Sequence, residues 1–157
     1  MSKRIQVPVQ SANEPIGNSG IPRLVEMLGL SMRRVAFAST DLLAERLAAH
    51  DSTPTRLTAL LVIAETPGLK LVELANALGI ARSGAVVLVD ELEQRGQVKR
   101  RPMPGDRRAH SLIATPKGLK ILLPLCAVAA ECDQQSYGAL SQRERQALLK
   151  LLDKLVA

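Results

Sequence analysis

The chain has 157 residues, of which 46% are apolar and only Phe37 and Tyr137 are aromatic, and its formal net charge is +6. This is enough for one domain, or for one domain with a dimerising extension, with a core of Leu, Ala, Val and Ile. No stretch reaches the roughly 18 uncharged apolar residues of a membrane-spanning helix, and no apolar segment follows Lys3 and Arg4 as a secretory signal requires. We therefore expect a cytoplasmic protein.

Hydrophobic periodicity and capping residues predict a mainly helical chain with one β-hairpin. Residues 1–20 show no period and are expected to form a flexible arm. The predicted helices cover residues 22–49, 54–66, 71–78 and 82–95, the hairpin has strands at 98–101 and 109–114 around a loop at 102–108, and two further helices begin at Pro116 and after Ser141.

Local signals define the ends of these helices. Thr53 and Thr115 are each followed by proline, a combination typical of an N-cap and a first helical residue. Gly79 is typical of a helix C-cap. Ser141 with Glu144 three residues later predicts a capping box at the start of the last helix.

A helix, a short turn and a second helix precede the hairpin, which is the order of a winged helix-turn-helix. Residues 95–120 contain eight Lys or Arg and a single acid, Asp106, and such a cationic patch indicates a polyanion as partner. The predicted fold is therefore mainly α with a small β-hairpin wing, and residues 51–118 form the double-stranded DNA-binding domain. A winged helix used only for protein contacts is the alternative, but it has no need of so many arginines.

The fourth predicted helix is the recognition helix of this interpretation. Ser83 and Gly84 make its start slim enough to enter a major groove, and its exposed first-turn amides can bind phosphate. Arg82 can reach a guanine edge or a phosphate. Val86 and Val87 leave two interpretations open: one of them contacts a thymine methyl group, or both widen the face that packs on the core.

The hairpin supplies the predicted contacts of the wing. Arg100 and Arg101 lie on its first strand, and Arg107 and Arg108 lie at its tip, where one arginine can enter a narrow minor groove. Asp106 can hold one of these arginines in place through a charge-assisted hydrogen bond. The alternative is an ordinary solvated run of charges paired with Asp106.

The first and last helices carry leucines at helical spacing that a small winged core cannot cover. We therefore expect residues 21–50 and 119–157 to form the dimerisation helices of a homodimer, with packing inside one chain as the alternative. In the last helix the stripe consists of Leu148, Leu151, Leu152 and Leu155.

No catalytic or metal site can be assembled from the sequence, so neither an enzyme nor a cofactor is expected. His50 and His110 have no cysteine or carboxylate at metal-ligand spacing. Cys126 and Cys132 lie six residues apart in one predicted helix, too far apart for an easy disulfide. A thiol-based redox-sensing repressor that uses one of them is a second functional hypothesis.

These residues resemble the MarR family of bacterial transcriptional regulators. The family's wing pattern, Asp-x-Arg-x-x-x-Leu-x-Leu-Thr followed by glycine, runs here from Asp106 through Leu112 and Thr115 to Gly118, with Ala114 in place of the second leucine. A second departure is the alanine at position 81, where the family often has a serine that caps the recognition helix. The resemblance covers about residues 23–157.

The resemblance implies a homodimer that binds a pseudo-palindromic operator, usually as a repressor, in the bacterial cytoplasm at the nucleoid. It also implies release by a small effector, such as an aromatic acid or its CoA thioester, bound between the dimerisation and DNA-binding parts. In this chain the residues expected to line that cleft are Arg33, Arg34, Phe37, Arg56 and Leu60. A guanidinium there can bind a carboxylate or phosphate bidentately, or Arg33 and Arg34 instead form a dimer-spanning salt bridge or contact the DNA backbone.

Overall fold

The computed structural model describes residues 27–103 and 106–156, so the arm expected at 1–20 lies outside the described residues. The chain divides into two compact units, Met1–Ala38 and Ser39–Ala157. Helix α1 (Leu28–Ala48) begins in the first unit and ends in the second.

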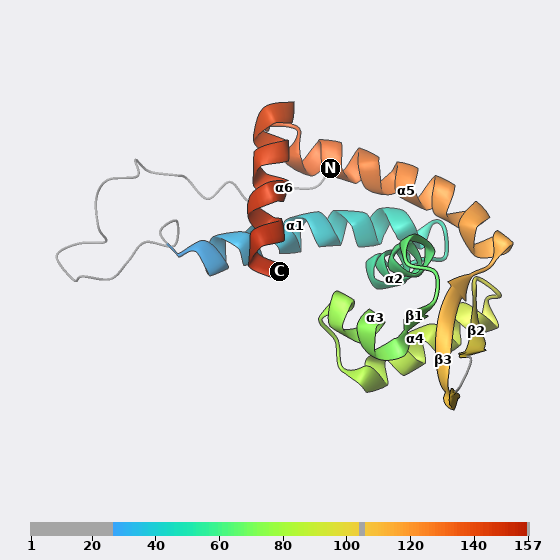
Figure 1. The fold of residues 1–157 in the computed structure, drawn as a ribbon. Coiled ribbons are helices and arrows are strands. Elements are labelled where there is room, and N and C mark those ends of the chain that lie inside the picture. The colour runs from blue at the N-terminus through green and yellow to red at the C-terminus, as the bar shows by residue number, and fades with distance from the viewer. Residues whose placement is uncertain (1–26, 104–105, 157) are drawn as a thin grey trace. The chain divides into compact units, whose positions relative to one another are not determined.

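The second unit contains every other described element, in the predicted order with one addition (Figure 1). These elements are α2 (Pro54–Glu65), β1 (Leu69–Lys70), α3 (Leu71–Leu78), α4 (Arg82–Gln94), β2 (Val98–Met103), β3 (Asp106–Ala114), α5 (Pro116–Tyr137) and α6 (Gln142–Val156). The prediction of a mainly α fold with a small β-hairpin is confirmed.

The addition is β1, which turns the predicted hairpin into a three-stranded antiparallel sheet of order β1-β3-β2. Its two residues pair with β3, Leu69 with Leu112 and Lys70 with Ser111. Two residues are too few to produce the alternation by which a strand is predicted from sequence.

The strands of the hairpin extend further than predicted, into the loop expected at 102–108. β2 continues to Met103 and β3 starts at Asp106. Pro102, which was expected in the loop, instead pairs with His110 just before a shift in register. Because β2 is an edge strand, the missing N–H of Pro102 need not disrupt the sheet.

The predicted helix ends are confirmed by their hydrogen bonds. The Thr53 and Thr115 hydroxyl oxygens accept from the backbone N–H groups three residues later, at 3.2 and 3.0 Å. Gly79 ends α3 in the left-handed region, with φ +63°. Ser141 and Glu144 form the capping box, in which the hydrogen bonds from Ser141 lower the pKa of the Glu144 carboxyl group.

One hydrophobic core fills the second unit and fixes the orientation of α4. The largest fully buried side chains come from α1, α2, α3, α4, β2 and β3; they are Leu47, Leu60, Ile63, Leu74, Val89, Leu92, Val98 and Leu112. Helix α4 contributes Ala85, Leu88, Val89 and Leu92 to the buried set, so its opposite side faces outward.

Gly118 is required where α5 begins against the turn between α4 and β2. A Cβ atom at this position would overlap the carbonyl oxygen of Gln97 and lie 3.0 Å from its carbonyl carbon. The same carbonyl oxygen accepts a 2.9 Å hydrogen bond from the Thr115 N–H, so it cannot easily move away.

We therefore expect Gly118→Ala to lower the free energy of unfolding by about 1–3 kcal/mol, the usual cost of overpacking, as measured by urea denaturation. Gly29→Ala is the matched control, because a Cβ there meets nothing within 4 Å. It should leave stability unchanged or raise it by up to about 1 kcal/mol. If the two variants were equally stable, the backbone at Gln97 would have moved aside for the new Cβ atom at no cost in stability.

Candidate nucleic-acid interface

The outward side of α4 begins with small and cationic residues. Arg82, Ser83 and Gly84 are all exposed, and the N-cap residue Ala81 makes no side-chain hydrogen bond to the helix. The backbone N–H groups of an uncapped, exposed first turn remain available to an anion. Such a helix start can approach a phosphate or a groove closely.

The two valines of α4 lie on this outward side. Val86 is 37% exposed and Val87 is 59% exposed, whereas the neighbouring Ala85 and Leu88 are buried. The interpretation that both valines widen the core face is therefore wrong. They form a small apolar surface after the first turn of the helix, which leaves the thymine-methyl contact as the remaining prediction.

The predicted wing residues differ in their exposure and in how far the structure describes them. Arg101 is exposed on β2. Arg100 is half-buried, with its guanidinium between two carboxylates of α4: it donates to Asp90 Oδ1 at 2.6 Å and to Glu93 Oε2. The side chains of Asp106, Arg107 and Arg108 lie outside the described residues, although their backbone belongs to β3.

Arg100 therefore fastens β2 to α4. Its backbone N–H also donates to Glu93 Oε1 at 3.1 Å, so main chain and side chain hold the same carboxylate. The sequence pattern identified Arg100 as a cation of the patch, but it did not reveal that Asp90 and Glu93 already pair with it.

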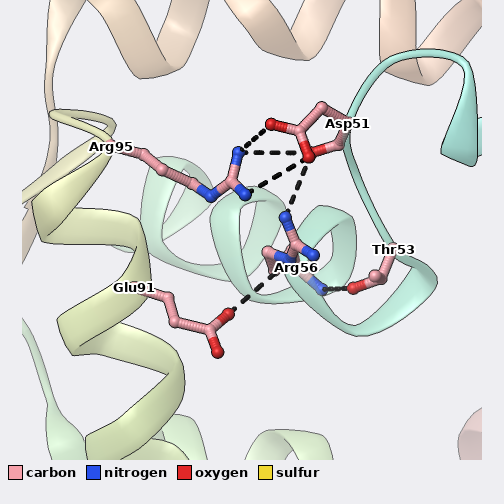
Figure 2. Close-up of polar contacts among 5 residues, drawn as sticks. All are labelled: Asp51, Thr53, Arg56, Glu91 and Arg95. Carbon is pink, nitrogen blue, oxygen red and sulfur yellow. Dashed lines mark hydrogen bonds and ion pairs between the residues drawn. The ribbon is translucent and has the colours of Figure 1, made fainter.

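A second polar network, at the same C-terminal end of α4, was missed by sequence analysis (Figure 2). The Arg95 guanidinium, just past the end of α4, donates to both carboxylate oxygens of Asp51, at 2.6 and 3.3 Å. Arg56 of α2 donates to the Asp51 carbonyl oxygen at 3.0 Å and lies 3.7 Å from the Glu91 carboxylate. The hydrogen bond and charge of Arg95 lower the pKa of the Asp51 carboxyl group, and Asp51 in turn raises the pKa of Arg95.

The residues expected to line an effector cleft are divided between the two units. In the first unit Arg33, Arg34 and Phe37 are exposed, and the Arg33 guanidinium lies 4.8 Å from the centre of the Phe37 ring. In the second unit Leu60 is 1% exposed and forms part of the core, while Arg56 belongs to the network around Asp51. An effector role for these five residues stays a prediction.

Known proteins resemble this chain in both sequence and fold. The MarR family model matches residues 50–109. A protein of Thauera aromatica, described as the candidate transcriptional regulatory protein for the hcr operon, is 35% identical over 129 residues, 82% of this chain and 78% of that relative. The chain belongs to the MarR family. It is thus related to DNA-binding transcriptional regulators and not to enzymes.

Solved structures of MarR-type repressors share the fold. The transcriptional repressor CouR bound to a 23-mer DNA duplex is 31% identical, with a TM-score of 0.77 over 85% of this chain and 95% of that one. CouR from Rhodococcus jostii RHA1 bound to p-coumaroyl-CoA is 23% identical, with a TM-score of 0.77 over 87% of this chain and 96% of that one. The expected winged helix-turn-helix class is therefore confirmed for this MarR-family chain.

Within the described residues, no single helix is both long and apolar enough to cross a membrane. Only the bent pair α3 and α4 meets that criterion, and only when the two helices are taken together.

We expect Arg100→Met to lower the free energy of unfolding by about 1 kcal/mol, a modest value because its two carboxylate partners are more than a third exposed. Arg101→Met is the matched control, since Arg101 is exposed one residue further along the same strand. It should change stability by less than about 0.5 kcal/mol. Urea denaturation of both variants measures the difference, and equal values would mean that the Arg100 ion pairs contribute no stability.

Proposed function

We propose that this MarR-family protein is a repressor that binds a pseudo-palindromic operator as a homodimer, in the bacterial cytoplasm at the nucleoid. The observation that carries the proposal is the outward side of α4, where an exposed, uncapped first turn is followed by two exposed valines. A helix whose exposed side starts with small residues and free N–H groups can enter a major groove. The structure of CouR bound to a 23-mer DNA duplex, which shares the fold, supports DNA as the partner.

In this proposal the predicted DNA-binding residues have distinct roles. Arg82, Ser83 and Gly84 bring the start of α4 to the groove floor or the phosphates, and Val86 and Val87 contact thymine methyl groups. On the wing, Arg101, Arg107 and Arg108 contact the backbone or the minor groove, with Asp106 orienting an arginine. Arg100 acts by positioning β2 against α4, because its charge is already paired with Asp90 and Glu93.

We propose that residues 51–118 bind DNA and that the helices within 21–50 and 119–157 form the dimer. Helix α6 supports this assignment, because its outer leucines are exposed in the single chain: Leu148, Leu149, Leu151 and Leu155. Apolar side chains repeated along one helix are typical of an interface with a second copy. A dimer would also place two recognition helices for two half-sites.

We further propose that a small molecule releases the protein from its operator, an aromatic acid or its CoA thioester being the expected class. The CouR complex with p-coumaroyl-CoA supports the idea that this fold accepts such ligands. The redox alternative has less support from the described residues, since Cys132 is buried and Cys126 packs against the core.

The DNA contacts can be tested by fluorescence anisotropy with a palindromic duplex from the DNA flanking the gene, at salt concentrations of about 50–200 mM. Arg108→Ala should weaken binding by about 1–3 kcal/mol if this arginine enters a groove. Arg101→Ala should weaken binding to all duplexes and reduce the salt slope by about 1. Arg143→Ala, at an exposed site on α6, is the control and should bind as the wild type does. Wild-type affinity of Arg108→Ala on every duplex would refute its assignment.

The dimer can be tested by sedimentation equilibrium. The wild type should have the mass of two chains, and Leu151→Glu should shift the equilibrium toward one chain because a carboxylate cannot be buried unpaired. Gln146→Glu adds the same charge at another exposed position of α6, outside the leucine stripe, and should remain dimeric. A dimer unaffected by Leu151→Glu would place the interface elsewhere.

A further inference from the structure

His110 is one of the two histidines in the chain, and it lies on β3, the second strand of the wing. It pairs with Pro102 of β2 at the last regular position before the shift in register. Its side chain is exposed and forms no hydrogen bond or ion pair with any residue that the structure describes. The ring N–H groups of this histidine are therefore available to a partner outside the chain.

The alternation of side chains along β3 places His110 on the side of the sheet that packs against α4. Leu112, two residues further along the strand, is buried in the core. Its partner on β2 is Arg100, whose guanidinium is bound to Asp90 and Glu93 of α4. Directly paired residues share one face of an antiparallel sheet. His110 therefore lies on the α4 side of the wing, two residues closer to its tip than Leu112.

The path of β2 along α4 indicates which part of the helix is level with His110. After the turn that follows α4, β2 runs back along the helix, and Arg100 pairs with Asp90. Two further residues of a strand cover about 6.6 Å, which is close to one helical turn of about 5.4 Å. His110 is therefore level with the preceding turn of α4, which carries the exposed Val86 and Val87.

Under the function proposed above, the surface between α4 and the wing faces the DNA backbone. A helix in the major groove and a wing in the adjacent minor groove lie on either side of the sugar-phosphate strand that separates the two grooves. His110 is on the α4 side of the wing and level with the part of the helix proposed to read bases. A ring N–H donor at this position can reach a phosphate oxygen of that strand.

We propose that His110 binds a DNA phosphate as the imidazolium cation, so that the affinity of the protein for DNA rises as the pH falls through neutrality. This contact rests on the function proposed above and adds one residue to the same interface. Histidine is the side chain that ordinarily changes its charge between about pH 5 and 8. A neighbouring phosphate favours the charged form, in which both ring nitrogens are donors. The arginines of the wing keep their charge throughout this range.

The described charged groups around His110 do not compete for its imidazolium. On α4, the carboxylates of Asp90 and Glu93 are both bound to Arg100. On α3, the carboxylate of Glu73 accepts a 2.8 Å hydrogen bond from a backbone N–H of β1. By their register, the cations of the neighbouring strands lie on the opposite face of the sheet; they are Lys70, Lys99 and Arg101. A phosphate can therefore bind the imidazolium without displacing an ion pair.

Fluorescence anisotropy at about pH 6 and about pH 8, at constant ionic strength, tests the contact. The probes are a palindromic duplex from the DNA flanking the gene and an unrelated duplex of equal length, both without terminal phosphates. The wild type should bind both duplexes more tightly at the lower pH, by about two- to fivefold per chain, the range for one exposed ion pair. The slope of log affinity against log salt should also steepen, by up to about 0.9 per chain, the value for one phosphate.

The two histidines of the chain provide matched variants. His110→Gln should bind each duplex equally at both pH values, because its side chain stays neutral. His110→Arg should also be independent of pH, but it should bind more tightly than His110→Gln, because its charge is permanent. His50→Gln changes the other histidine, which is exposed between α1 and α2, and should keep the pH dependence of the wild type. Thermal unfolding at both pH values checks that each variant is folded.

The outcomes distinguish this contact from DNA binding itself. A wild type that binds no duplex at either pH refutes the proposed function, and the contact with it. A wild type that binds DNA equally at both pH values refutes the contact alone, as does a pH dependence that persists in His110→Gln or disappears in His50→Gln. A pH dependence limited to the palindromic duplex would also overturn the phosphate assignment, because a phosphate contact does not depend on sequence.

Discussion

The pairing of the carboxylates on α4 with arginines of neighbouring elements is the interaction on which the rest of the interface depends. Asp90 and Glu93 pair with Arg100 of β2, and Glu91 lies near Arg56 of α2. Unpaired, these acids would repel the phosphates that a recognition helix must approach. Paired, they attach β2 and α2 to α4, and under the proposed function the start of α4 is the part that meets the DNA.

This pairing lowers the number of unpaired positive charges in the cationic patch at residues 95–120. Counted along the sequence, Arg95, Arg100 and Lys117 belong to it as fully as Arg101 does. In the structure the first three are bound to Asp51, to the α4 carboxylates and to a backbone carbonyl, whereas Arg101 is exposed. The charges available to DNA are therefore fewer than the count suggests, because Arg95 and Arg100 already have carboxylate partners, whereas Arg101 has none among the described residues.

Features with local causes could be predicted from the sequence, and features with distant causes could not. The caps at Thr53, Thr115 and Gly79 depend on residues within one helical turn, so their chemistry is visible in the order of the residues. The Asp51–Arg95 pair joins residues 44 positions apart. No periodicity indicates such a contact, because it depends on how α4 packs against the loop before α2.

The two attachments of α4 differ in a way that suits them to different tasks. Arg100 is half-buried and binds Glu93 through both its backbone N–H and its side chain, so one residue attaches β2 to α4 at two points. Asp51 is mostly exposed, so its ion pair with Arg95 can open without disturbing the core. If the Asp51–Arg95 pair opens, α4 and β2 should therefore still move together, because Arg100 continues to connect them.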